Sequence, residues 1–234
     1  MKNVQEWEIG FDQLYNNITS NKAPGLNSFE KSRFLTDAQE AIVVGLYNGS
    51  FGKAFESTED VSNYLAPLVA QANFEQVITG DFPKVSATKS FIFELPDGKP
   101  EILFRTLELC TLTEDCGDVQ AVVVPVTQDE YWRTSRDPFK RQNERKVLRL
   151  IYSDASVADG NLSVQKYSEL ISDFTIKDYT VRYIKRPEPI ILRDLPNGLS
   201  IQGKTAAQTC LLDDALHQAI LTEAVRLAKA AWMN

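Results

Sequence analysis

Histidine, cysteine and methionine are scarce in this sequence, with one, three and two of them among 234 residues. A zinc site needs more imidazole or thiolate ligands than this chain offers. A Ser-His-Asp triad would depend on His217 alone, and no G-x-S-x-G elbow accompanies it. We therefore predict no metal site, no cofactor and no catalytic residue, so the protein is not expected to be an enzyme. His217 itself is interpreted as a polar helix residue or a buried hydrogen-bonding group.

The cysteines Cys110, Cys116 and Cys210 form no C-x-x-C pair. An odd, sparse set predicts free thiols in a reducing compartment. Long hydrophobic runs are also missing, because the two longest, at 41–47 and 121–126, are far too short to span a bilayer. The N-terminus has acidic residues where a signal peptide needs an apolar stretch. We expect a soluble protein that is neither secreted nor bound to a membrane.

Positive charge is in the minority, with 25 basic and 32 acidic residues and a net charge of −7. This balance argues against a general nucleic-acid coat and against adhesion to an anionic membrane. The charge is also uneven, with a net −6 over residues 1–83 and a net +5 over residues 131–149. Two interpretations stay open: the basic segment is a solvated loop, or it attracts the acidic part of another copy.

The first part of the chain has apolar residues at helical spacing, which predicts helices near 4–19 and 29–47 and from Ser57 to Ala72. Asn27 and Glu30 match a capping box ahead of the second helix, and Asn48-Gly49 is a stop signal. Pro67 is expected to kink or end the third helix.

After Pro83 the pattern becomes that of strands, including two around a Pro96-Asp97-Gly98 turn. Pro187 and Pro189 lack backbone N–H donors, so their segment is expected at a sheet edge or a bulge. From about Thr205 to Trp232 the pattern is helical again.

The order of helices, strands and one last helix predicts an α+β fold. In this prediction the N-terminal helices and the long C-terminal helix form a helical bundle with an inserted, mostly antiparallel β region. The parts expected are an N-terminal helical part over 1–83, a β-rich region over 84–204, and a C-terminal helix over 205–234.

One motif matches a known phosphate-binding pattern. GLSIQGKT, residues 198–205, matches the phosphate-binding P-loop pattern through Gly198, Gly203, Lys204 and Thr205. A P-loop domain needs a parallel sheet with crossover helices, and only 29 residues follow Thr205. The favoured interpretation is an ordinary turn before the last helix, with a P-loop NTPase as the alternative.

Three blocks carry a resemblance to a known family. They are VVVPVTQDEYWRTSRDPFKRQNERKVLRLIY at 122–152, DYTVRYIKRPEPIILRDLPNGLSIQG at 178–203 and TCLLDDALHQAILTEAVRLA at 209–228. The chain resembles the virion neck proteins of crAss-like tailed phages that infect gut Bacteroidales, namely the ring proteins that extend the portal. The resemblance covers about residues 26–232 and is firmest from 122 onward.

The resemblance implies a structural subunit of a head-to-tail connector ring that links portal to tail, with about twelve copies matching a portal. Its expected partners are other copies of itself, the portal and neighbouring neck or tail proteins. Packaged DNA is expected to pass through the ring without sequence-specific binding. The expected location is the virion neck, after assembly in the host cytoplasm. A monomeric virion cargo protein is a further alternative. The residues proposed for contacts are Arg133, Arg136, Arg141, Arg145, Pro187, Pro189 and Trp232.

Overall fold

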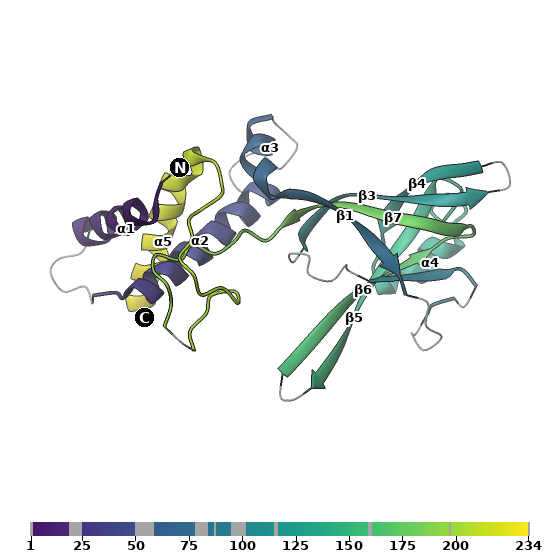
Figure 1. Cartoon of the computed structure of the whole chain (residues 1–234). Coiled ribbons are helices and arrows are strands. Elements are labelled where there is room, and N and C mark those ends of the chain that lie inside the picture. The colour runs from purple at the N-terminus through teal and green to yellow at the C-terminus, as the bar shows by residue number, and fades with distance from the viewer. Residues whose placement is uncertain are drawn as a thin grey trace. The chain divides into compact units, whose positions relative to one another are not determined.

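The computed structural model describes residues 2–18, 25–49, 59–77, 84–86, 88–94, 102–114, 117–158, 161–196 and 198–233. The chain forms two compact units, one from Met1–Val69 with Arg186–Asn234 and one from Ala70–Lys185. The first unit is helical and the second is built from strands (Figure 1). Within the described ranges, no helix has the length and apolar character needed to cross a membrane.

The helical unit contains α1 (Val4–Ile18), α2 (Ser28–Asn48), α3 (Glu59–Leu65), a 3-10 turn (Ala66–Leu68) and α5 (Asp214–Met233). The predicted capping box of α2 is confirmed, because the Asn27 side chain accepts the Glu30 N–H and the Glu30 carboxylate accepts the Asn27 N–H, both at 2.8 Å. Gly49 ends this helix with φ 75°, a left-handed conformation that glycine adopts without a Cβ clash.

The core of the helical unit lies where α5 packs against α2 and α1. A Cβ at Gly10 of α1 would lie 3.1 Å from Leu221 Cδ1, so the glycine permits α1 to approach α5 closely. The buried faces come from all three helices: Trp7, Phe11, Leu35, Ala38, Ile42, Leu216, Ile220 and Ala224.

The last helix begins later than predicted, at Asp214 instead of Thr205. Residues 205–213 are held in irregular structure by other partners: Leu195 donates its N–H to Thr205 O, and Ile191 pairs with Gln208. The helix then starts where the Asp213 carboxylate accepts the Ala215 N–H at 2.9 Å.

The third predicted helix is shorter than its apolar pattern suggested. Helix α3 ends at Leu65, and Pro67 lies in the 3-10 turn that follows. The prediction that Pro67 interrupts the helix is confirmed, but residues from Val69 on form a strand.

The second unit is a closed barrel in the order β1-β2-β6-β5-β4-β3-β7. Among the strand pairs of the described residues, β4 with β5 is parallel and the others are antiparallel. The strands are β1 (Val69–Gln76), β2 (Ser90–Glu94), β3 (Ile102–Glu114), β4 (Gly117–Pro125), β5 (Lys146–Ala158), β6 (Asn161–Ile171) and β7 (Thr175–Lys185), and α4 (Gln128–Arg136) connects β4 to β5.

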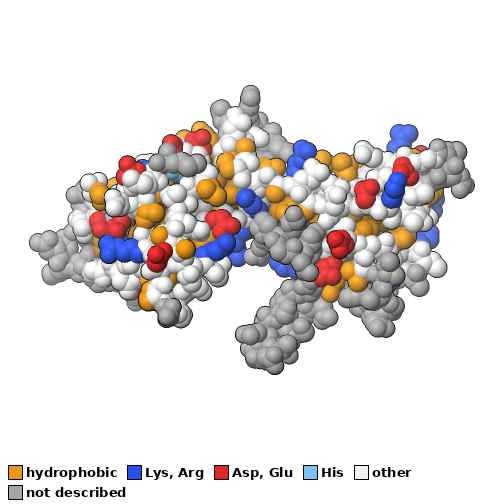
Figure 2. Space-filling model, in the orientation of Figure 1, with side chains coloured by type: hydrophobic (Ala, Val, Ile, Leu, Met, Phe, Trp, Pro, Cys, Tyr) orange, Lys and Arg blue, Asp and Glu red, His pale blue; other side chains and the backbone are white. Residues whose placement is uncertain are grey.

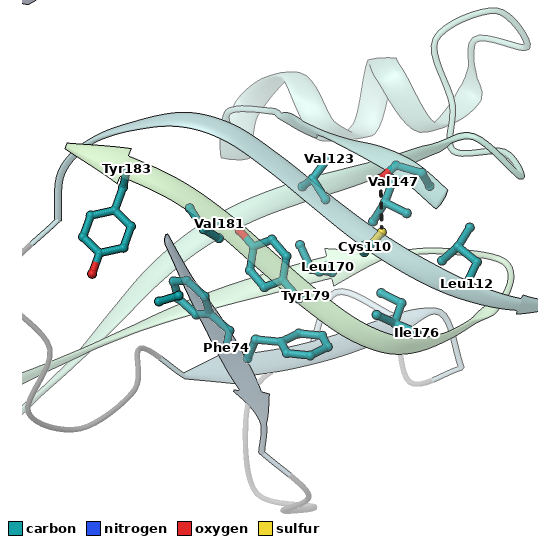
Figure 3. Packing of buried hydrophobic residues seen from close by; sticks show 13 residues of the cluster. Phe74, Cys110, Leu112, Val123, Val147, Leu170, Ile176, Tyr179, Val181 and Tyr183 are labelled. Carbon is teal, nitrogen blue, oxygen red and sulfur yellow. Dashed lines mark hydrogen bonds between the residues drawn. The ribbon is translucent and has the colours of Figure 1, made fainter. Parts of the chain in front are cut away.

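The barrel interior is filled by side chains from β1 to β7 (Figure 3). Tyr179 lies at its centre, with its ring 4.8 Å from Phe74 and 5.4 Å from Phe93 between centroids. Such tilted and edge-on aromatic pairs are favourable geometries. The Cys110 thiol contacts the Ala121 carbonyl oxygen at 3.8 Å and is buried in this core.

The predicted fold class is therefore wrong. The prediction is a helical bundle with an inserted β region, whereas the described residues form a seven-stranded closed β-barrel and five α-helices. Closure depends on β3, which pairs with β4 on one edge and β7 on the other and shifts register three times along β7. Such pairings join distant parts of the chain, and apolar alternation within one strand does not reveal them. The predicted Pro96-Asp97-Gly98 turn and Cys116 lie outside the described residues.

Candidate functional site

Helix α4 covers one part of the outer face of the barrel. Tyr131 and Val126 pack against the buried side chains of Leu148, Leu150 and Ile171. Burial, and next the charge of Glu169, raise the pKa of Tyr131. At the start of the helix, the Thr127 hydroxyl makes no side-chain cap bond to a backbone N–H. It bonds the Asp129 carboxylate instead and lowers the pKa of that group. One side of α4 is thus anchored, and the other side faces solvent.

The solvent side of α4 carries Trp132, Arg133 and Arg136. The Trp132 side chain is 63% exposed, and the Arg136 guanidinium lies over its ring at 4.3 Å from the centroid. This cation–π contact holds the two side chains together at the surface.

The turn after α4 is organised by side-chain-to-backbone hydrogen bonds. The Asp137 carboxylate accepts the Phe139 N–H, and the Asn143 side-chain oxygen accepts the Arg145 N–H, both at 2.9 Å. Both are Asx turns, which stabilise a defined loop conformation. In this conformation Phe139 is 92% exposed.

The predicted contact arginines Arg133, Arg136, Arg141 and Arg145 are all exposed and lie on α4 and this turn. Together with Trp132 and Phe139 they form what we call the α4 surface. Sequence reasoning found the arginines but missed the two aromatic residues, although large apolar residues in the polar segment YWRTSRDPFKR were a usable signal. Arginine, tryptophan and phenylalanine are enriched in protein interfaces.

Elsewhere the surface charges are mixed. Acidic, basic and hydrophobic side chains are interspersed over the face drawn in Figure 2. A mixed surface of this kind has no region of one sign large enough to indicate a nucleic-acid site there.

The other predicted contact residues belong to the helical unit and not to the α4 surface. Pro187 and Pro189 are buried in an extended segment beside α2 and not in a sheet edge. There the Thr36 hydroxyl accepts the Ile190 N–H at 3.1 Å, and the Ser32 hydroxyl accepts the Leu192 N–H at 3.0 Å. Trp232 belongs to the last turn of α5, and its side chain is outside the described part of the molecule.

The segment that matches the P-loop pattern has a different geometry. Ile201 pairs with Lys204 across a tight turn in which Gln202 and Gly203 have φ of 50° and 75°. Lys204 Nζ lies 3.6 Å from the Glu188 carboxylate, and the next helix begins only at Asp214. A phosphate cradle needs the glycine-rich loop to enter a helix N-terminus directly, so this turn lacks that arrangement.

The single histidine is a buried structural residue. His217 is 1% exposed, its ring is 4.9 Å from that of Trp7, and its Nε2 lies 3.2 Å from the Leu212 carbonyl oxygen. Burial lowers the pKa of His217. No group of three or more His, Cys, Asp or Glu side chains in the described ranges is arranged to hold a metal ion.

Among the described residues, a buried ionic group lies inside the barrel. Arg149 Nε is 2.8 Å from Glu108 Oε2, and Arg105 Nη1 is 3.4 Å from the same oxygen. The Tyr179 hydroxyl donates to Glu108 and accepts from Arg105, which also donates to Ser168. Burial lowers the pKa of Arg149 and raises that of Tyr179. The group acts as a polar core of the barrel.

The described molecule thus combines a β-barrel unit with a helical unit, and it carries an exposed cluster of aromatic and arginine side chains on α4 and the turn after it. The chain belongs to the family described as phage tail ring protein 3/4, which it matches over residues 1–234. It is 38% identical to Ring protein 3 of Bacteroides phage crAss001 over 233 residues, covering 96% of this chain and 94% of that protein. It is also 35% identical to Ring protein 4/5 of the same phage over 241 residues, covering 99% and 94%. The resemblance to crAss-like phage ring proteins is confirmed.

Proposed function

We propose that this chain is the structural subunit of a closed ring in the head-to-tail connector of a crAss-like phage. The ring contains about twelve copies, matches a portal of the same symmetry and links the portal to the tail. The observation that carries the proposal is the α4 surface, found on a chain that belongs to a family of ring proteins. Two large aromatic side chains are held in solvent, Trp132 by helix α4 and Phe139 by the ordered turn after it, and their exposure is costly unless a partner covers them.

The distribution of exposed charges supports contacts between copies of this chain. Arg133, Arg136, Arg141 and Arg145 are exposed, whereas the helical unit carries exposed acids such as Glu6, Glu30 and Asp37. In the proposed ring the α4 surface faces an acidic surface of a neighbouring subunit or ring. Contacts of this kind tune the association rate and its salt dependence more than the final affinity.

The other proposed contact residues have separate roles. Trp232 at the end of α5 is a further contact with a neighbour or the portal. Pro187 and Pro189 are buried, so in this proposal they act by stiffening the segment that leaves the barrel. The net charge of −7 suits a channel through which DNA passes without binding.

Native mass spectrometry and negative-stain imaging of the purified chain, alone and with portal, test the proposal. We expect closed rings. Reversing one charge by Arg133→Glu is expected to slow assembly strongly at low salt and less at high salt, because salt screens exposed charges. Lys84→Glu makes the same charge change on an exposed barrel residue outside the α4 surface and is expected to assemble normally.

Two outcomes would favour other functions. A chain that remains monomeric alone and with portal would support a virion cargo protein. Micromolar binding of ATP or GTP with magnesium, abolished by Lys204→Ala, would support a P-loop NTPase despite the hairpin geometry of that turn.

A further inference from the structure

One side of the barrel is covered by its own helix, and a different side is left exposed. Helix α4 lies on β5 and β6, where Tyr131 packs against Leu148, Leu150 and Ile171. In the barrel order, β4 and β3 separate β5 from β7, and β2 and β1 separate β6 from β7. The outer face of β3 and β7 therefore lies on a different side of the barrel from α4.

The exposed side is formed by the outward residues of three neighbouring strands. Cys110 of β3, Ala121 of β4 and Tyr179 of β7 are buried in the interior, so the residues that alternate with them point outward. We call the central outward residues the β3–β7 face: Leu107, Leu109, Val122, Asp178, Thr180 and Arg182.

The centre of the β3–β7 face is apolar. Leu109 pairs with Val122 on one side and with Thr180 on the other, and Leu107 pairs with Arg182. The side chains of Leu107 and Val122 are 41% and 50% exposed. Neighbouring apolar side chains left in solvent are typical of surfaces that contact another protein.

The β3–β7 face also has a hollow of about 200 Å³, lined in part by Leu107, Leu109, Asp178 and Arg182. Pockets for small-molecule ligands usually measure about 300–1,000 Å³. The hollow is smaller than that, and its size suits a single side chain from a partner.

Opposite charges lie at the two ends of this face. Asp178 and Arg182 are four residues apart on β7, which at about 3.4 Å per residue separates them by roughly 14 Å. The Asp178 carboxylate accepts the Thr111 hydroxyl at 3.0 Å, and neither Asp178 nor Arg182 forms an ion pair among the described residues.

Helix α4 has the complementary arrangement on its solvent side. Asp129 lies in its first turn, and Arg133 and Arg136 lie in its last turn. At a rise of 1.5 Å per residue, Asp129 and Arg136 are roughly 10 Å apart along the helix. All three are exposed, and Trp132 beside them is 63% exposed.

We propose that the solvent side of α4 lies on the β3–β7 face of a second copy of this chain. Trp132 enters the hollow between Leu107 and Leu109. When α4 runs antiparallel to β7 of the second copy, its arginines meet Asp178 and its Asp129 meets Arg182. Since α4 is anchored on β5 and β6, it cannot reach the β3–β7 face of its own barrel.

This contact joins two different surfaces of one chain, so each α4 lies between its own barrel and that of a neighbour. A heterologous contact of this kind produces a ring when its rotation closes. The inference therefore rests on the proposed ring function and names the contact that joins neighbouring subunits.

Substitutions on the β3–β7 face test the contact. Asp178→Arg and Leu107→Asp are each expected to raise the protein concentration needed for assembly by about tenfold or more, because one opposes Arg133 and Arg136 and the other places a carboxylate in an apolar contact. The matched controls are Asp37→Arg and Leu199→Asp, which make the same changes at exposed residues of the helical unit. Both controls are expected to assemble like the wild type, and circular dichroism checks that all variants fold.

Mixing two charge variants gives a sharper result. In Arg133→Glu alone, the new glutamate opposes Asp178 of the neighbour, and in Asp178→Arg alone, the new arginine opposes Arg133. In a mixture of the two chains every contact pairs opposite charges, provided that the chains alternate. Native mass spectrometry at low salt is expected to show impaired assembly of each variant alone and oligomers with equal numbers of both chains in the mixture.

The outcomes separate this inference from the ring itself. If the wild type assembles and Asp178→Arg or Leu107→Asp assembles equally well, or if the mixture assembles no better than its components, α4 does not contact the β3–β7 face and the inference is wrong. Impaired assembly of Asp37→Arg with normal assembly of Asp178→Arg would place the contact on the helical unit instead. If the wild type forms no homo-oligomer alone or with portal, the proposed ring function fails as well.

Discussion

Arg149 and Glu108 form an ion pair inside the barrel, with Arg149 Nε 2.8 Å from Glu108 Oε2 and both side chains at most 7% exposed. Arg105 also approaches this carboxylate, at 3.4 Å. The Glu108 carboxylate therefore contacts two arginines, of which Arg149 is almost fully buried. Removing one partner of a buried ionic group costs far more than the net contribution of the pair, since it leaves charge without compensation.

Replacing Glu108 with Gln is therefore expected to lower the free energy of unfolding of the barrel by about 3–5 kcal/mol. Urea denaturation followed by tyrosine and tryptophan fluorescence measures it. Glu144→Gln removes an exposed carboxylate from the same unit and should change stability by less than about 0.5 kcal/mol. Equal effects of the two substitutions would show that the buried cluster is not structurally important.

Helix α5 is expected to hold the helical unit together through a few buried side chains. Ile220 is fully buried where α5 packs on α2 and α1, so Ile220→Ala should destabilise the unit by about 2–5 kcal/mol. Gln218→Ala changes an exposed position two residues away and should leave the melting temperature nearly unchanged. A small effect of Ile220→Ala would mean that α5 contributes little to this core.

The features that were predictable from sequence are those set by neighbours in the chain. The capping box of Asn27 and Glu30, the glycine stop at Gly49 and the break at Pro67 each depend on residues within a few positions, and the structure contains all three. Barrel closure depends on pairings such as β2 with β6, which lie about 75 residues apart in sequence. No pattern within either strand indicates that these two strands pair with each other.

At the candidate site, too, some features were predictable from the sequence and others were not. The arginines of the α4 surface were visible as a run of charge, but the exposure of Phe139 follows from an Asx turn at Asp137 that composition does not reveal. Pro187 was expected at a sheet edge because it cannot donate a hydrogen bond. It lies instead beside α2, where Ser32 and Thr36 hydroxyls satisfy the neighbouring backbone N–H groups.

The buried histidine makes the helical unit sensitive to mild acid. Burial holds the pKa of His217 below its ordinary value of 6.5, while Asp214 raises it and Lys2 lowers it by smaller amounts. The unfolded chain then binds a proton that the folded chain does not, so stability should be full above about pH 6.5 and fall as the pH decreases below it. Thermal melts between pH 8 and pH 5 measure this.

His217→Gln keeps a hydrogen-bond donor that can reach the Leu212 carbonyl oxygen but cannot take up a proton in this range. The variant should be less stable at neutral pH because of poorer packing on Trp7, and it should lose part of the decrease in stability between pH 7 and pH 5. An identical pH dependence in wild type and variant would mean that other groups are responsible.

Two cysteines are expected to be inert as long as the protein is folded. Burial raises the pKa of Cys110 to about 12 and that of Cys210 to about 11. The thiolate is the reactive form, so at pH 8 roughly one Cys110 in ten thousand and one Cys210 in a thousand would be ionised even if a reagent could reach them.

A Cys116→Ser chain removes the third thiol, and its reaction with a chromogenic disulfide reagent then reports on these two alone. We expect almost no reaction in native buffer and two equivalents after addition of guanidinium chloride. Rapid reaction of either thiol in native buffer would show that the core around it opens to solvent. Mass spectrometry of the labelled peptides distinguishes the barrel core at Cys110 from the helical core at Cys210.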